Sequence, residues 1–439
     1  MLASCGGQGS FSGQPNGTYV VNVTVSGLSN LNNNNLNLQI GSNGYRLNFT
    51  SDATKSFPYQ NLGTLPHVSV ITPPSPIVCR VGPEVNAGAN VINVAVKCSL
   101  QYVYVTNTGN TGSLSVWELE VDGSLRQASV ATSLHNPTSA VVNPNPMIPF
   151  VYVASAADQR IYSFQVSNGV LSNMTFVNCA SSPNAPLYLS ASANGSLLFC
   201  ASRSGLVSVY DISGGSAAQL PSPSTNLGTA ITGIAVDPLG QFLYVINGTT
   251  FNTSSINSYA VDTNWALTLK DSYTSTTSTQ VSSPTSVAIN TSGNNLFVVN
   301  SGSGNVLSFN LVAGTLHNLP NNISALNNPH AITLTGDGTT AYVSVYGQQN
   351  SATNILQLGI NNGVLSNSNS VTSVHSGPFA LAVDATNFGL FVTGFPYPFG
   401  VASDSTLTEY STPNLTPVTV GSKTYSSGLI DVPISVTVY

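Results

Sequence analysis

Short runs of alternating apolar and polar residues fill the first part of the chain, and they predict half-buried β-strands. The clearest run spans residues 19–25 (YVVNVTV), and another spans residues 91–98 (VINVAVKC). Gly, Asn, Ser and Pro separate the runs, as turns between strands require. About seven such strands between residues 18 and 98 predict an immunoglobulin-like β-sandwich.

From residue 99 onward two strand patterns recur, and they indicate a repeat architecture. The first is a strand of aromatic residues and Val, with copies that begin at residues 102, 150, 198, 242, 296, 341 and 390. The second is a strand led by Pro, with copies at Pro137, Pro186, Pro284, Pro329 and Pro378 and degenerate copies at Ile231 and Ser427. With further outer strands and a period of about 48 residues, each repeat has the pattern of a four-stranded blade. Seven copies of each unit predict a seven-bladed β-propeller.

The two ends of the repeat region are incomplete in complementary ways. The aromatic strand at 102–107 has no Pro-led strand before it, and the Pro-led strand at 427–439 has no aromatic strand after it. We expect the C-terminal strand to pair with the first one, because this closes the ring and removes open sheet edges. The alternative is that residues 427–439 form a strand-rich tail that is not part of any blade. The chain is thus expected to be all-β, with a tether at 1–17, a sandwich at 18–98 and a propeller at 99–439.

The YVTN sequence at 104–107 and the Pro-led strands resemble the YVTN-repeat, lactonase-type seven-bladed β-propellers. This resemblance covers residues 99–439 and implies the propeller fold. The segment 18–98 resembles small sandwich modules that precede bacterial surface domains. The sugar-lactonase branch of the propeller family hydrolyses phosphogluconolactone, and the resemblance implies a polar cluster of His, Arg and acidic residues around the central channel.

Composition narrows the function classes. Only 5% of residues are charged, and nine Lys and Arg against fifteen Asp and Glu leave a net charge of -6. Nucleic-acid binding needs a clustered basic footprint, which nine residues do not supply. No apolar run reaches 18 residues, so the sequence predicts no membrane-spanning helix. The hydrophobic share of 41% is enough for a packed core, and a surface of Asn, Ser, Thr and Gly is expected.

The N-terminus and the five cysteines bear on the compartment. The sequence Leu-Ala-Ser-Cys that ends at Cys5 resembles the bacterial lipobox, which implies lipidation of Cys5 and a place in the bacterial cell envelope, lipid-anchored at the outer membrane, or outside the cell. The charged and apolar parts of a signal peptide are missing, so a chance tetrapeptide is the alternative. With Cys5 set aside, four cysteines remain, and in an exported protein this even number predicts two disulfides, Cys79–Cys98 and Cys179–Cys200. No metal-ligand spacing is present, and neither a metal nor a cofactor is expected.

The residue after each leading Pro should ring one mouth of the channel. These positions are Thr138, Leu187, Thr232, Thr285, His330, Phe379 and Gly428. Pro329-His330 matches the Pro-His of the sugar-lactonase branch, but only one blade keeps this His and the ring holds no Arg, Asp or Glu. Opening a lactone needs a base for water and a donor for the developing oxyanion. His330 is the one candidate base, and a hydrogen-bonded mouth residue is the favoured interpretation.

Two hypotheses follow. The first is a monomeric, non-catalytic binding or scaffold protein that contacts a protein or glycan at the cell surface. Its expected contact residues are His330, Tyr346, Gln348, Phe379, Phe395, Tyr397 and Phe399, because aromatic faces and amides suit uncharged ligands. The residues 395–399 are alternatively a plug that packs into the channel. The second hypothesis is a lactonase-type hydrolase with a degenerate site. A carboxylate or guanidinium within about 4 Å of His330 would favour the hydrolase.

Overall fold

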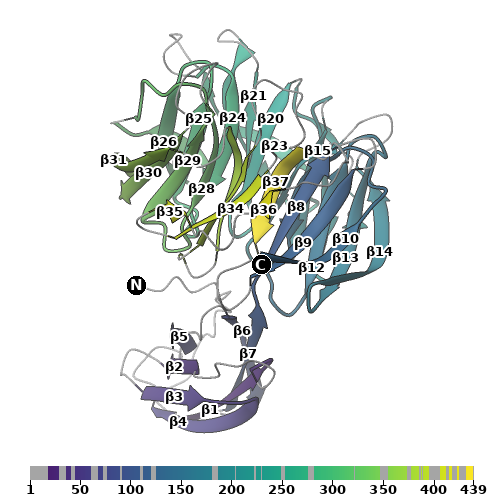
Figure 1. The fold of residues 1–439 in the computed structure, drawn as a ribbon, viewed down its shortest axis with the longest axis vertical. Coiled ribbons are helices and arrows are strands. Elements are labelled where there is room, and N and C mark those ends of the chain that lie inside the picture. The colour runs from purple at the N-terminus through teal and green to yellow at the C-terminus, as the bar shows by residue number, and fades with distance from the viewer. Residues whose placement is uncertain are drawn as a thin grey trace. The chain divides into compact units, whose positions relative to one another are not determined.

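The computed structural model shows an all-β protein (Figure 1). It describes residues 18–28, 36–40, 45–60, 68–72, 77–88, 91–108, 112–119, 125–179, 186–202, 204–221, 224–228, 230–248, 253–274, 281–320, 322–346, 354–372, 377–384, 387, 389–394, 406–411, 415–417, 423–424 and 432–438. Nowhere in these ranges is there a helix that is long and apolar enough to cross a membrane. The chain divides into two compact units, one built mainly from residues up to Gln101 and one that extends from Tyr102 to the end.

The N-terminal unit contains two sheets that share one core. The first sheet has the order β4-β1-β7-β6, and the second has the order β3-β2-β5. Their bounds are β1 (Thr18–Ser26), β2 (Leu36–Ile40), β3 (Tyr45–Phe49), β4 (Ala53–Gln60), β5 (Val68–Thr72), β6 (Ile77–Gly88) and β7 (Val91–Leu100). Alternate residues such as Val21 and Val23 of β1 and Leu36 and Leu38 of β2 are fully buried in this core, so period-two patterning places the apolar faces of both sheets inward. Cys79 of β6 lies opposite Cys98 of β7, and the two form a disulfide, the first pairing expected from the sequence.

The second unit consists of seven sheets of four or five strands, which are the blades of a propeller. Blade one contains β37 (Val432–Val438), β8 (Tyr102–Thr108), β9 (Ser113–Leu119) and β10 (Leu125–Ala131); blade two contains β11 (Pro137–Val142), β12 (Phe150–Ser155), β13 (Arg160–Ser167) and β14 (Val170–Asn178). Blade three contains β15 (Pro186–Ala191), β16 (Leu197–Ser202), β17 (Leu206–Asp211), β18 (Ala218–Gln219) and β19 (Thr225–Asn226); blade four contains β20 (Ile231–Val236), β21 (Phe242–Asn247), β22 (Ser255–Val261) and β23 (Leu267–Thr274). Blade five contains β24 (Pro284–Ile289), β25 (Asn295–Asn300), β26 (Asn305–Val312) and β27 (Thr315–Asn318); blade six contains β28 (Pro329–Leu334), β29 (Thr340–Val345), β30 (Asn354–Asn361) and β31 (Val364–Thr372). Blade seven contains β32 (Pro378–Val383), β33 (Gly389–Gly394), β34 (Thr406–Ser411), β35 (Thr416–Pro417) and β36 (Lys423–Thr424).

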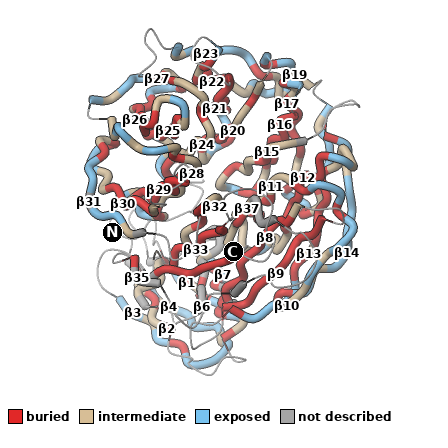
Figure 2. The backbone as a smooth tube through the Cα atoms, turned by 45° about the horizontal axis from the view of Figure 1, so that its top comes forward, coloured by how far each residue is buried: buried red, intermediate tan, exposed pale blue. Residues whose placement is uncertain are grey.

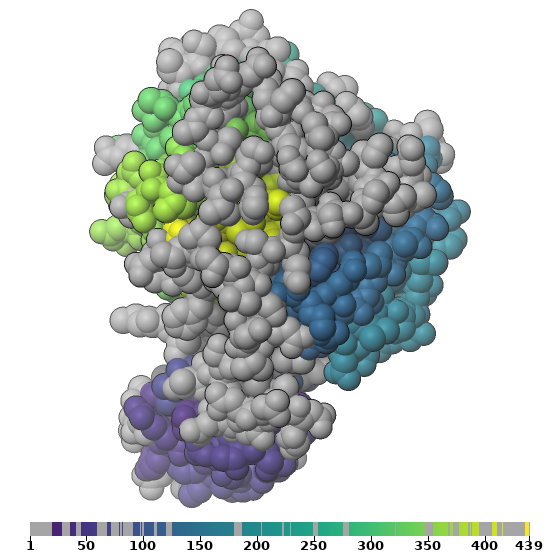
Figure 3. Space-filling model, viewed as in Figure 1, coloured from purple at the N-terminus to yellow at the C-terminus, as the bar shows by residue number. Residues whose placement is uncertain are grey.

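Burial explains why the aromatic pattern recurs. The second strand of each blade is packed between neighbouring blades, and its aromatic residues include the largest fully buried side chains, such as Tyr104, Tyr152 and Phe391. Outer strands such as β14 are mainly exposed, which Figure 2 shows as pale blue at the rim. In the space-filling view the described atoms of blades one and two form a continuous outer surface in blue and teal (Figure 3).

The ring closes as the sequence predicted. The C-terminal strand β37 pairs with β8 in antiparallel register, with Val436 opposite Val105, and completes blade one. The alternative of a lone tail is therefore wrong. The leading Pro of this blade is Pro433, opposite Asn107 in YVTN, just as Pro137 is opposite Ser155 in blade two. The sequence predicted the leading residue of this strand at Ser427, six residues before Pro433. Gly428, the predicted mouth residue, lies outside the described residues.

Each inner strand has a β-bulge directly after its leading residue. In blade two the ladder runs from Pro137 to Ser139 and omits Thr138, and in blade six it omits His330. A bulge leaves its extra residue out of the ladder and re-aims that side chain. In every blade the ladder thus skips the residue after the leading one. In blade one the skipped residue is Ile434.

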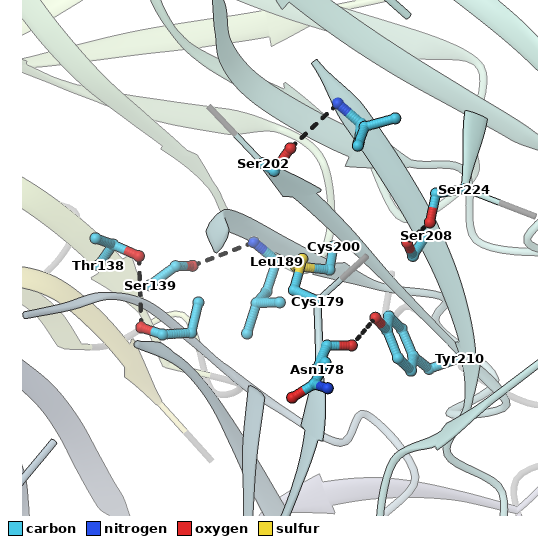
Figure 4. The surroundings of a disulfide bond; sticks show 12 residues. Thr138, Ser139, Asn178, Cys179, Leu189, Cys200, Ser202, Ser208, Tyr210 and Ser224 are labelled. Carbon is cyan, nitrogen blue, oxygen red and sulfur yellow. Dashed lines mark hydrogen bonds between the residues drawn. A yellow bond between two sulfur atoms is a disulfide. The ribbon is translucent and has the colours of Figure 1, made fainter. Parts of the chain in front are cut away.

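The second disulfide joins two neighbouring blades (Figure 4). Cys179 directly follows β14, the outer strand of blade two, and Cys200 belongs to β16, the second strand of blade three. Both cysteines are buried. Tyr210 supports the same junction, because its hydroxyl donates a hydrogen bond of 2.5 Å to the carbonyl oxygen of Asn178.

We expect replacement of both Cys179 and Cys200 by Ala to lower the unfolding free energy of the propeller by about 3 kcal/mol. The reason is that the bond closes a loop with a sequence separation of 21 residues, which restricts the unfolded chain. Urea unfolding followed by Trp fluorescence would measure the change, with the oxidised wild-type protein as the control. An unchanged midpoint would show that the bond adds nothing to the packing of the two blades.

Candidate functional site

Three of the predicted contact residues meet at the bulges of blades six and seven. The ring centroids of His330 and Phe379 are 3.9 Å apart with the planes tilted by 32°, and Tyr346 approaches Phe379 edge-on at 6.4 Å. His330 and Phe379 are half-buried, whereas Tyr346 is buried. The other predicted contact residues, Gln348, Phe395, Tyr397 and Phe399, lie outside the described residues, as does the proposed lipidation site Cys5. The choice between a plug and a contact surface therefore stays a prediction.

Hydrogen bonding fixes the tautomer of His330. Its Nδ1 lies 3.2 Å from the carbonyl oxygen of Phe379, and because a carbonyl only accepts, Nδ1 carries the proton. Burial lowers the pKa of His330, and the hydrogen bond to Phe379 only partly opposes this effect. The ring is therefore neutral at pH 7, with a lone pair on Nε2. Among the described residues no carboxylate or guanidinium is bonded to His330, so the arrangement that would favour a hydrolase is not found at this residue.

A second histidine forms a charged cluster on blade two. His135 lies in the segment that leads into β11, and Asp158 lies in the turn between β12 and β13. The Nδ1 atom of His135 is 2.7 Å from Oδ1 of Asp158, and the backbone N–H of His135 donates to Oδ2 at 3.0 Å. Asp158 also accepts hydrogen bonds from the hydroxyls of Ser155 at 2.6 Å and Tyr162 at 3.1 Å.

These contacts keep Asp158 ionised. Burial opposes the charge, but the hydrogen bonds from Ser155 and His135 outweigh burial and hold the pKa of Asp158 below its usual value. The His135 side chain is 58% exposed, and its Nε2 makes no hydrogen bond within the described part of the chain. A carboxylate on one ring nitrogen orients a histidine and fixes which nitrogen carries the proton. The pair therefore has the parts of a general base that solvent can reach.

A guanidinium is linked to this pair through Tyr162. Arg160 begins β13, and its Cζ lies 4.0 Å from the ring centroid of Phe176 on β14. Arg160 also hydrogen-bonds with Tyr162, which in turn donates to Asp158. The contact with Phe176 places the positive charge over the outer strand of blade two.

No sequence motif joins Asp158 to His135. The two are 23 residues apart, and only the packing of the β12–β13 turn against the entry to β11 brings them together. The backbone N–H of Ala157 donates to the carbonyl oxygen of His135, which fixes this packing. Within the described residues no group of three or more His, Cys, Asp or Glu side chains is placed to hold a metal ion.

Comparison with known families gives one match. The family described as "Lactonase, 7-bladed beta-propeller" matches residues 101–230 and 219–325. The matched segments begin just before β8 of blade one and end after β27, the last strand of blade five.

Similar proteins agree with this family. A 6-phosphogluconolactonase of Klebsiella pneumoniae subsp. pneumoniae is 32% identical over 118 residues, which cover 26% of this chain and 34% of the relative. A second strain of Klebsiella pneumoniae has a 6-phosphogluconolactonase that is 31% identical over the same length. The chain thus spans about a third of the length of the curated relatives that it matches.

Solved structures show the same fold at low identity. A putative 6-phosphogluconolactonase from Bacteroides fragilis superimposes with a TM-score of 0.60 at 16% identity, over 78% of this chain and 98% of that one. A periplasmic gluconolactonase from Pseudomonas aeruginosa superimposes with a TM-score of 0.57 at 18% identity, over 77% of this chain and 97% of that one.

We expect His330 to make folding stability fall in acid. Its pKa in the folded protein is lowered from 6.5, so the unfolded chain gains a proton first as the pH falls below that value. The free energy of unfolding of the wild type should therefore decrease more between about pH 7.5 and pH 5 than that of His330→Gln, measured by urea titration. His317→Gln is the control, because His317 is exposed on β27. Equal pH dependence in wild type and His330→Gln would contradict the prediction.

Proposed function

The chain belongs to the lactonase family of seven-bladed β-propellers, and on that premise we propose that it hydrolyses a cyclic ester with His135 as general base. The observation that carries the proposal is the 2.7 Å contact between Nδ1 of His135 and Oδ1 of Asp158 on an exposed face. The relatives and structural neighbours are named as lactonases, which supports this function. Nothing among them supports a non-catalytic scaffold.

The chemistry follows from the protonation states of the pair. Nδ1–H of His135 is held by the carboxylate of Asp158, so Nε2 accepts a proton from a water molecule. The resulting hydroxide adds to the lactone carbonyl, and the ring C–O bond then breaks. The imidazolium returns its proton to the leaving alkoxide, which yields the open hydroxy acid. Arg160 brings the positive charge that a developing oxyanion needs to the same loop.

The mouth residues have a different proposed role. His330, Phe379 and Tyr346 offer aromatic faces and a neutral imidazole, which suit an uncharged part of a ligand. Gln348, Phe395, Tyr397 and Phe399 remain proposed members of this contact surface. A protein or glycan partner and a monomeric state likewise remain proposals.

For the rest of the chain we propose an exported, lipid-anchored protein. The two disulfides support a place outside the cytoplasm, because disulfides persist in oxidising compartments. Lipidation at Cys5 remains proposed from the lipobox-like sequence. The two sheets of the N-terminal unit, with one shared core, support the proposed immunoglobulin-like sandwich at residues 18–98, followed by the propeller at 99–439.

The test is hydrolysis of a panel of sugar lactones, with and without a phosphate group, by the full chain. We expect His135→Ala to lower kcat/KM by about 100-fold or more, as removal of a general base does. Asp158→Asn should lower it as well, because the imidazole loses its orienting carboxylate.

His317→Gln is the matched control, because this exposed histidine lies on the outer strand of blade five. If His330→Gln abolishes turnover while His135→Ala leaves it intact, the base is at the mouth and this assignment is wrong. If the wild type opens no lactone faster than buffer does, the proposed activity itself fails.

A further inference from the structure

Blade seven contains two buried carboxyl groups that approach the same point. Asp384 follows β32 and is 5% exposed, and Glu409 lies in β34 and is 8% exposed. A Cβ atom placed on Gly389 would lie 3.0 Å from Oδ2 of Asp384 and 3.3 Å from Oε1 of Glu409. Glycine at this position therefore leaves the space in which the two carboxyl groups converge.

Glu409 is unusual among the equivalent positions of the propeller. It lies opposite Phe391 in the ladder, and the residues in the same place in the other blades are Val116, Ser163, Val209, Ser258, Ser308 and Gln357. All six are uncharged. Among the residues that the structure describes, the Oε2 atom of Glu409 has no hydrogen-bond partner, although the residue is more than nine-tenths buried. A buried, unpartnered carboxyl oxygen is costly when it is charged and indicates a further role.

The side chain of Glu409 is directed toward the seam of the ring. Leu390, Val392 and Tyr410 of blade seven pack against Tyr342 and Ile355 of blade six. Successive residues of a strand point to opposite faces, so Phe391 and Glu409 point away from blade six. On that side β32 and β33 pack against β37, the strand that closes the ring.

Few charged groups surround Glu409. Asp384 faces it from the turn after β32. Tyr410 is on the opposite face of β34, and β36 places Lys423 opposite Leu407, two residues away from Glu409 along β34. The described residues of β37 and β33 carry no ionisable side chain. In the described residues no third acidic, His or Cys side chain joins these two carboxyl groups.

We propose that Glu409 is a proton-dependent latch on ring closure. When its carboxyl group is protonated, it is neutral beside Asp384 on the face of blade seven that is turned away from blade six and toward blade one. When it loses the proton, two negative charges face each other in a buried space, and the repulsion weakens the packing of blade seven against blade one, which β32 and β33 contact through β37. This inference does not rest on the proposed hydrolase activity.

The direction of the pH effect follows from the environment of Glu409. Burial, followed by the negative charge of Asp384, raises the pKa of Glu409 from 4.5 to about 7. In the unfolded chain the group ionises near 4.5, so the folded state is penalised increasingly as the pH rises from that value to about 7. The latch is thus fully closed in acid and progressively weakened toward neutral and alkaline pH.

The test is hydrogen exchange of the full chain, read by mass spectrometry on peptides that cover β37, with β25 of blade five as an internal reference. The variant is Glu409→Gln, which has the shape of the protonated acid and which blade six already accommodates as Gln357. We expect β37 to exchange at least tenfold faster in the wild type than in Glu409→Gln at about pH 8, and at the same rate at about pH 4.5. Exchange of β25 should not differ between the two proteins at either pH.

A second variant separates charge repulsion from burial. Asp384→Asn keeps a side chain of the same size but removes the neighbouring charge. The proton affinity of Glu409 should therefore fall, and the difference in β37 exchange from Glu409→Gln at about pH 8 should shrink. A constant ratio of exchange rates across the pH range, or a change in β25 as large as that in β37, would overturn the proposal.

Discussion

The pairing of β37 with β8 is the constraint on which the propeller depends. It joins strands that are more than 300 residues apart and makes the first blade complete. Without it β8 would have an open inner edge at the centre of the ring, and β32 and β33 of blade seven would lose the strand that they pack against. Because such long-range contacts form late, the ring closes only after nearly the whole chain is available. The inter-blade disulfide reinforces only the junction of blades two and three and does not contribute to this closure.

The repeat architecture was predictable because packing between blades imposes a strict pattern. Buried aromatic residues such as Tyr152 and Phe297 recur where a blade faces its neighbour. Period-two alternation shows which other residues of each strand lie on the same face of the sheet. The leading Pro of most blades could also be predicted from the sequence. In blade one it could not, because only the pairing of Pro433 with Asn107 identifies it, and no local pattern in residues 427–439 marks its position. Both cysteine pairs were found because the spacing of the strands brings them together.

The candidate site was much harder to foresee. The sequence drew attention to His330 through its leading Pro, and the structure shows a neutral histidine on a backbone carbonyl. The charged pair of His135 and Asp158 depends on how one loop packs on one turn, and nothing in either segment specifies the partner. Likewise, Glu409 occupies a strand position that looks polar and ordinary, and its burial beside Asp384 appears only in three dimensions. Repeats reveal the framework, whereas differences between repeats carry the chemistry.

The bulge after each leading residue has a consequence for how such a propeller diversifies. Five residues sit at positions that the backbone ladder skips, namely Thr138, Thr232, Thr285, His330 and Phe379. The hydroxyls of Thr138 and Thr232 donate to carbonyl oxygens of the adjacent strand, but the register of the ladder does not depend on these side chains. A substitution there changes the lining of the mouth while the strands on either side keep their register. The ring thus presents seven sites that mutation can vary one at a time, and a new specificity can arise in single steps without a reorganised sheet.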